Sequence, residues 1–443
     1  MRTIGRRLQL WFAIAIGLGV VVSGTAWAGD VKDILVDVVR PVSGSTITSP
    51  FDCVFRGLCN LPSANFDSLL EADSGALAPL ELDSLASVTS GVVNDRIVPL
   101  SSSVSGFTYD YNPDLDVYDR STKTFGPLFS ERAQTIGKKR FLVGLSQSYL
   151  EFDQYNGDNL DSITLSELGG QLPLGESGAE FDGVTLISQL NEREQGNLLD
   201  VDLDLNIKEW VSTGYFTYGL TERIDVGIVV PLMRIKAKAS ARALESDSEL
   251  LRCDDPSLDL LGDTPCFGTN VVSSNSKTEN HTGIGDLVVR GKWNYYVGVV
   301  NAAFTAEATI PTGDPDNLTG LHTMTYRPGM VVSKDFETPI GGLGLQAYAG
   351  YNFRPDIPDE QEFDWAVGGA LQPFGRASIS FDLIGSNETR GQENFLLDGS
   401  VGLKLMLAQN VLVDFNWIAP LNDDGLRPSA GIFTFQIEGT FGD

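Results

Sequence analysis

The feature that most restricts the fold is the C-terminal run from Gly431 to Phe441, in which residues of two kinds alternate without a break. The first kind is apolar or glycine (Gly431, Phe433, Phe435, Ile437, Gly439, Phe441), and the second is mostly polar (Ile432, Thr434, Gln436, Glu438, Thr440). Among regular structures only a β-strand has this period of two. The chain therefore ends in a strand with one apolar, aromatic face and one largely polar face.

The same alternation recurs upstream and predicts twelve strands in all. Their expected ranges are 141–153, 199–218, 223–240, 282–295, 299–311, 322–335, 342–354, 363–372, 374–385, 395–407, 411–419 and 429–441. A small hairpin is also expected from Gly106–Tyr111 and Asp116–Phe125, and counting it as part of the wall would give fourteen strands. A soluble sandwich alternates as well, so alternation alone does not fix the class.

The lengths of the connections distinguish a membrane barrel from a soluble sandwich. Short links such as Gly219–Arg223 and Ala408–Asn410 fall at one end of the strands, and long excursions such as Gln154–Asn197 and Ala241–Glu279 fall at the other. This asymmetry, together with aromatic-rich apolar faces, is typical of outer-membrane barrels with short periplasmic turns. A sheet that spans a membrane must also close, because an open edge would leave backbone groups unpaired in lipid. We predict an all-β, closed antiparallel transmembrane barrel, with a secreted soluble β-protein as the alternative.

The N-terminal region divides into a targeting segment and an extension. Residues 1–28 resemble a signal peptide, with Arg2, Arg6 and Arg7 before an apolar run and Ala26-Trp27-Ala28 as the cleavage site. Residues 29–140 lack a sustained strand pattern and are predicted to form an extension or a plug in the lumen. The barrel is predicted to occupy residues 141–443, which places the protein in the outer membrane of a Gram-negative cell.

The charge balance limits the partners. Lys and Arg number 31 against 59 Asp and Glu, which gives a net charge of −28. A nucleic-acid partner is excluded, because phosphate binding requires a basic face. The acids are interpreted as solvated loop residues, and binding of divalent cations by the loops is the alternative.

The cysteines form two local pairs, Cys53 with Cys59 and Cys253 with Cys266. In an exported protein such pairs predict disulfides, although four cysteines allow three connectivities. No histidine lies close to either pair, and thiolates would be oxidised in that compartment. No metal site and no cofactor are therefore expected.

Several short motifs resemble one known family. They are Tyr218–Gly227, Thr282–Leu287 followed by Arg290 and Lys292, Pro311–Asp314, Gly350–Phe353, and Phe125–Phe129 followed by Glu131–Ala133. These segments are similar to the outer-membrane transporters named for the meta pathway of phenol degradation, which are related to fatty-acid and aromatic-compound channels. The resemblance implies uptake of small hydrophobic or aromatic solutes and no enzymatic activity. Glycines at turns and local backbone bonds from Thr221 and Asp225 explain part of these motifs without any contact to a solute.

The strand parity places charged side chains inside the barrel. The inward candidates are Asp286, Arg290, Lys292, Glu307, Arg327, Arg354, Asp364, Asp382, Asp398, Lys404, Asp414 and Glu438. Buried charges need partners, so these residues are expected to form ion pairs that brace the wall. The alternative is that some of them line the solute path and set its charge preference.

Catalytic chemistry is not indicated. The two histidines, His281 and His322, lie near loop ends, and no serine stands in a recognisable motif beside either. The expected function is a channel that passes small hydrophobic or aromatic molecules into the periplasm. The alternatives are a structural or surface-interaction barrel and a membrane-embedded hydrolase. The expected partners are the solute, outer-membrane lipid, lipopolysaccharide and, during biogenesis, the barrel-assembly machinery.

Overall fold

The computed structural model describes residues 109–112, 117–120, 124–127, 129–165, 199–245, 271–321, 323–355, 361–389 and 395–442. The predicted signal peptide, the four cysteines and His322 lie outside the described residues. Among the described residues, no helix is long and apolar enough to cross a bilayer.

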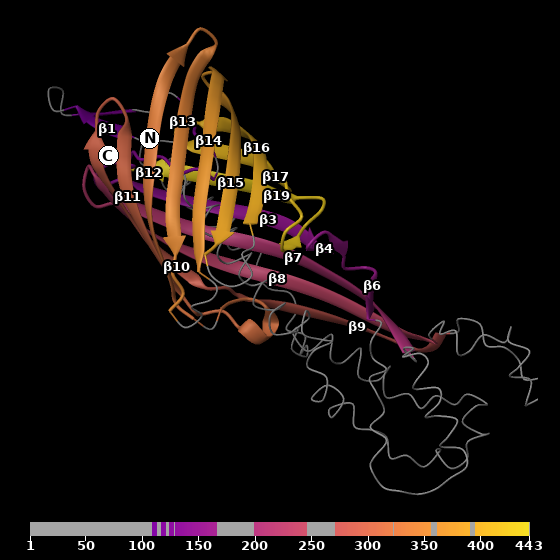
Figure 1. Ribbon diagram of the computed structural model, residues 1–443. Helices are drawn as coiled ribbons and strands as arrows, with labels where there is room; N and C mark the ends of the chain where they lie inside the picture. The colour runs from indigo at the N-terminus through magenta and orange to yellow at the C-terminus, as the bar shows by residue number, and fades with distance from the viewer. Residues whose placement is uncertain are drawn as a thin grey trace, which may run out of the picture.

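Twelve antiparallel strands form a closed barrel (Figure 1). They are β3 (Phe141–Phe152), β7 (Leu199–Gly219), β8 (Ile224–Glu245), β10 (Leu287–Val297), β11 (Asn301–Ile310), β12 (Thr325–Thr338), β13 (Gly341–Asn352), β14 (Glu362–Phe374), β15 (Ala377–Glu388), β16 (Phe395–Ala408), β17 (Val411–Pro420) and β19 (Ile432–Phe441). Closure occurs at β3, where Phe141 lies opposite both Phe441 of β19 and Tyr218 of β7. The predicted closed barrel of twelve strands is confirmed.

The expected hairpin forms, but it is not part of the wall. Its strands, β1 (Tyr109–Asn112) and β2 (Val117–Arg120), pair with each other in a separate two-stranded sheet. The alternative of fourteen wall strands is therefore wrong. At the rim, β4 (Gln154–Tyr155), β5 (Asp158–Asn159) and β18 (Leu426–Arg427) make a small three-stranded sheet.

One side of the wall is longer than the sequence predicted. β8 continues to Glu245, and an additional strand, β9 (Val271–Ile284), pairs with β8 beyond the segment that pairs with β10. The short β6 (Ile163–Leu165) pairs with the other long strand, β7. Figure 1 shows β7, β8 and β9 extending past the remaining strands. The prediction of a loop over 241–279 is wrong at both ends. β9 was missed because, between Val272 and Ile284, its residues are polar or glycine on both faces and show no apolar period.

The outward faces carry exposed apolar side chains. On β8 these are Ile224, Val226, Ile228 and Val230, and on β17 Phe415 and Trp417 are 49% and 45% exposed. An apolar surface of this extent is unfavourable in water and matches the lipid-facing band of a membrane barrel. The opposite faces of the same strands carry the buried side chains that make up the lumen.

Candidate functional site: the lumen and the segment that crosses it

The segment from Phe129 to Gly137 lies inside the barrel and is anchored at one end on β15. The carboxylate of Asp382 accepts hydrogen bonds from the backbone N–H of Ser130 at 3.0 Å and from its hydroxyl at 2.5 Å. The hydroxyl of Ser400 donates to the second oxygen of Asp382 at 3.1 Å. Asp382 is 4% exposed, so this anchor is largely shielded from water.

The segment then reaches the opposite wall. The backbone N–H of Ala133 donates to the hydroxyl of Ser333 on β12 at 3.2 Å, and its carbonyl accepts from the amide of Asn294 on β10 at 2.8 Å. The N–H of Ile136 donates to the carboxylate of Asp225 on β8 at 3.1 Å. β8 and β15 are six strands apart in the ring of twelve. The segment therefore crosses the full width of the lumen, and we call residues 129–137 the crossing segment.

A charge network joins the crossing segment to the wall. Glu131 pairs with Arg290 at 2.9 Å and with Lys292 at 3.2 Å, and Arg290 also pairs with Glu307 at 3.0 Å. The network continues from Glu307 to Arg327 at 3.5 Å. The wall groups of this network come from three neighbouring strands, β10, β11 and β12. The crossing segment contributes Glu131, which lies beside two wall cations.

The charge network extends over one further strand, because the strand in between carries a glycine. Arg327 on β12 pairs with Asp364 on β14 at 3.1 Å, past the intervening β13. Directly opposite Asp364 lies Gly350, which has no side chain to block this approach. A Cβ at Gly350 would also lie 2.1 Å from the hydroxyl oxygen of Tyr348. Arg290, Glu307, Arg327 and Asp364 thus form one continuous chain of charges along the inner wall.

The other predicted lumen residues form separate pairs. Arg354 lies 3.3 Å from Glu362, Asp398 lies 2.7 Å from Arg427, and Lys404 lies 3.5 Å from Asp414. Glu438 accepts hydrogen bonds from the hydroxyl of Tyr215 at 3.4 Å and from the amide of Gln436 at 3.3 Å. Sequence reasoning did not select Glu131, Asp225, Glu362 or Arg427, because these residues lie in irregular segments or at strand ends, where parity gives no signal.

Asp286, another of the predicted inward residues, accepts hydrogen bonds from the backbone of a loop. Its side chain is 0% exposed and accepts hydrogen bonds from the backbone N–H groups of Thr312 at 3.0 Å, Gly313 at 2.8 Å and Leu321 at 2.6 Å. The enclosed loop contains the short 3-10 helix η5 (Pro315–Asn317). Asp286 therefore fixes this loop against the wall at the junction of β9 and β10.

A small cavity lies between the crossing segment and the wall. It measures about 20 Å³ and is lined by residues that include Glu131, Ile136, Asp225, Arg290 and Lys292. A cavity of this size holds about one water molecule. At this level the crossing segment and the wall fit together closely.

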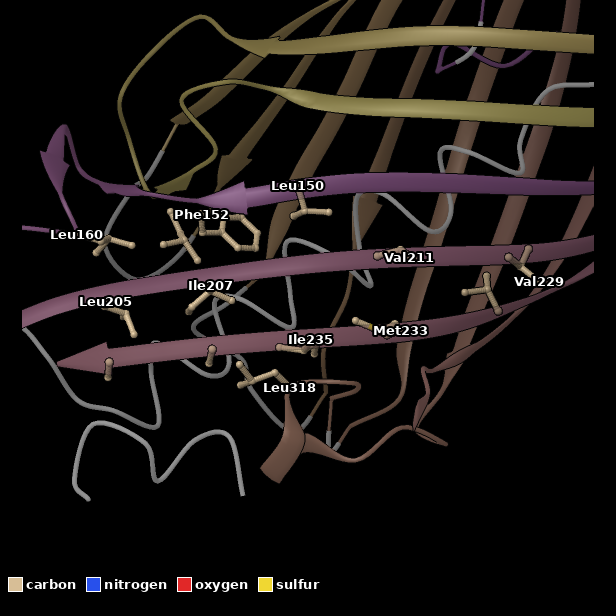
Figure 2. Packing of buried hydrophobic residues seen from close by; sticks show 14 of the residues in the cluster. Leu150, Phe152, Leu160, Leu205, Ile207, Val211, Val229, Met233, Ile235 and Leu318 are labelled. Atoms are coloured by element: carbon tan, nitrogen blue, oxygen red, sulfur yellow. The ribbon is translucent and has the colours of Figure 1, made fainter. Parts of the chain in front are cut away.

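Apolar side chains gather on the inner faces of β3, β7 and β8, as Figure 2 shows. We call the following buried side chains the apolar track: Ile136, Leu142, Leu150, Phe152, Leu205, Ile207, Val211, Val229, Met233 and Ile235. They belong to one contiguous cluster, which runs from the end with long connections to the crossing segment at Ile136. Inward parity alone did not predict the track, because inward positions were expected to be polar.

One carboxyl group interrupts the apolar track. Glu209 is 0% exposed and lies between Ile207 and Val211 on β7, across from Leu150 and Ile235 on the neighbouring strands. Among the residues that the structure describes, neither of its carboxyl oxygens has a hydrogen-bond partner. A buried polar group without a partner costs stability, so proteins retain such groups mainly at functional positions.

Metal ligands do not gather in the part of the chain that the structure describes, since no group of three or more His, Cys, Asp and Glu side chains has the arrangement of a metal site there. His281 lies on β9 with its side chain partly buried.

Three solved outer-membrane structures align with the chain at low identity. The COG4313 outer membrane channel from Pseudomonas putida F1 is 10% identical, with a TM-score of 0.41, over 70% of this chain and 98% of that chain. A Pseudomonas aeruginosa FadL homologue is 11% identical, with a TM-score of 0.33, over 78% and 98%. The Ralstonia pickettii toluene transporter TbuX is 9% identical, with a TM-score of 0.28, over 69% and 88%. No curated protein sequence matches the chain significantly.

The sequence profile of one protein family matches residues 182–431, which is more than half of the chain. The matched range contains ten of the twelve barrel strands in full, together with the motifs at Tyr218–Gly227 and Thr282–Leu287. The chain therefore belongs to the family described as "Putative MetA-pathway of phenol degradation".

Proposed function

We propose that this protein is an outer-membrane channel that passes small apolar organic molecules into the periplasm along the apolar track, and that the crossing segment closes the passage. The observation that carries this proposal is the extent of the track, which forms one cluster from the end with long connections to Ile136 and is interrupted at Glu209. An apolar solute could move along its side chains without meeting a paired charge until it reaches Ile136 of the crossing segment. Polar solutes gain nothing from such a surface, since their polar groups would lose water without replacing its hydrogen bonds.

The proposal is tested by solute uptake in intact Gram-negative cells with and without the protein. We expect production of the protein to increase uptake of radiolabelled naphthalene and to leave uptake of a small sugar unchanged. A structural barrel would change neither uptake rate. The hydrolase alternative would instead show ester hydrolysis that a serine-directed reagent abolishes.

Replacing Leu205 by Gln places an amide within the apolar track, where Leu205 is 2% exposed. We expect naphthalene uptake to fall roughly tenfold, because an added polar group in an apolar path is worth about 1–3 kcal/mol. Leu205→Met keeps the volume and the apolar character and should retain the original rate. Heat-dependent gel migration checks that both variants fold. Equal uptake by the two variants would place the route elsewhere.

Glu209 is expected to favour solutes that carry a hydroxyl group, because its buried carboxyl can bond a donor that the track itself does not supply. Glu209→Leu should raise the free energy of unfolding by about 1–3 kcal/mol, and it should lower uptake of 2-naphthol relative to naphthalene. Chemical denaturation and paired uptake assays measure the two effects. Glu209→Gln, which keeps a polar group, serves as the control. An unchanged uptake ratio in the Leu variant would remove Glu209 from the solute path.

A further inference from the structure

The outward face of β8 changes character along its length. Its first five outward residues, from Ile224 to Leu232, are apolar, and the strand then presents Arg234, Lys236, Lys238 and Arg242, all exposed. In a chain with a net charge of −28, four cations on one face of one strand depart from the average composition. The change lies on the side of the long connections, which in outer-membrane barrels faces the cell exterior.

Aromatic side chains mark the same level of the wall. The ring of Trp210 on β7 lies 5.2 Å from that of Tyr149 on β3, and the guanidinium of Arg234 lies 5.9 Å from the Trp210 ring. Tyr and Trp are enriched where a membrane barrel passes from lipid into the headgroup layer. The cations that follow Arg234 are therefore at the height of the headgroups of the outer leaflet.

The neighbours of the two central lysines are uncharged or basic. Lys236 lies between Lys208 on β7 and Asn280 on β9, and Lys238 lies between Asn206 and Thr278. Within the described part of the chain, neither lysine has a carboxylate beside it in the strand register. Arg242 lies opposite Asp202 on β7 and is therefore left out. The basic face comprises Arg234, Lys236 and Lys238, flanked by these amide and hydroxyl groups.

The nearby carboxylates have other partners. Glu151 on β3 pairs with Lys208 at 2.8 Å and accepts hydrogen bonds from Asn206 at 2.7 Å and Tyr149 at 3.1 Å. Asp204 accepts from the hydroxyl of Ser240 at 3.4 Å. Glu151 lies on β3, and Asp204 lies on β7 opposite Ser240. Among the described residues, neither acid forms an ion pair with Lys236 or Lys238.

We propose that the basic face binds the phosphate groups of the phosphorylated glycolipid in the outer leaflet, that is, the lipid A part of lipopolysaccharide. Alternate residues on a strand are about 7 Å apart and adjacent strands about 4.8 Å apart. Several cations and hydroxyl donors can therefore reach one sugar phosphate together, while the acyl chains cover the apolar residues from Ile224 to Leu232. The inference rests on the outer-membrane location and is independent of transport.

The test uses the full protein, purified in detergent, stripped of bound lipid and titrated with bisphosphorylated lipid A. The double variant Lys236→Gln/Lys238→Gln should bind lipid A roughly 10- to 30-fold more weakly. Each lysine near an anionic headgroup contributes separately to the affinity, so the two losses multiply. The matched control is Arg223→Gln/Arg376→Gln, which removes two exposed cations from the turns at the opposite end of the barrel. It should bind as the original protein does.

Two further arms use the unaltered protein, so the result does not depend on folding of a variant. Dephosphorylated lipid A should bind about as weakly as bisphosphorylated lipid A binds to the double variant. Inorganic phosphate at the same concentration should not displace lipid A. Equal binding of the two lipid A forms, or equal affinities of the double variant and its control, would overturn the proposal. Displacement by inorganic phosphate would assign the face to soluble anions and would also overturn it.

Discussion

Replacing Gly368 by Val is expected to release the crossing segment and to open the barrel to ions. Gly368 lies on the inner face of β14, where a Cβ would stand 2.1 Å from a carboxylate oxygen of Asp382 and 2.2 Å from the hydroxyl oxygen of Ser130. Neither atom can keep its place, so the anchor on β15 is lost. Hydrogen bonds to a charged group contribute about 1.5–3 kcal/mol each. Loss of about 3 kcal/mol would raise the open fraction roughly a hundredfold.

Planar-bilayer conductance measures this effect. Gly291→Val is the matched control, because Gly291 faces outward from β10 and a Cβ there meets nothing within 4 Å. A chain without residues 29–137 sets the conductance of the unobstructed barrel. If the shortened chain conducts and Gly368→Val remains closed, the β15 anchor does not hold the segment in place. If the shortened chain does not conduct, the lumen is not an aqueous pore even without the segment.

The wall could be derived from the sequence because lipid imposes a simple rule on it. Each strand must present apolar residues to the bilayer, and the run from Gly431 to Phe441 therefore alternates over its whole length. The start of the barrel at Phe141 and the count of twelve strands follow from the same rule and from the lengths of the turns. The rule of apolar alternation does not apply where the wall extends beyond the bilayer, and β9 was therefore not predicted.

The arrangement inside the lumen could be derived only in part. Strand parity selects inward residues, but it does not select partners such as Arg327 and Asp364, which meet past a strand that carries Gly350. The crossing segment has no regular period, and its path is fixed by single contacts to distant strands, for example from Ile136 to Asp225. Contacts of this kind depend on the assembled barrel, so no local pattern in the sequence predicts them.

The second large effect is expected at the ion pair of Lys404 and Asp414. These residues face each other on β16 and β17, with both side chains 0% exposed and 3.5 Å between the ammonium nitrogen and a carboxylate oxygen. Lys404→Met leaves the carboxylate of Asp414 buried without its cation. We expect the free energy of unfolding to fall by about 3–5 kcal/mol, the usual cost of breaking a buried pair on one side. Denaturant-induced unfolding in lipid, followed by tryptophan fluorescence, measures the loss.

Two further variants test whether this loss of stability comes from the buried charge that is left unpaired. The double variant Lys404→Met/Asp414→Leu removes both charges and should recover most of the stability, because no uncompensated charge is left in the wall. Lys208→Met breaks the pair with Glu151, whose side chains are 36% and 31% exposed, and it should cost no more than about 1 kcal/mol. If Lys404→Met costs as little as Lys208→Met, water reaches the lumen beside Asp414. The pair would then contribute to the charge of an open passage and would not brace a dry wall.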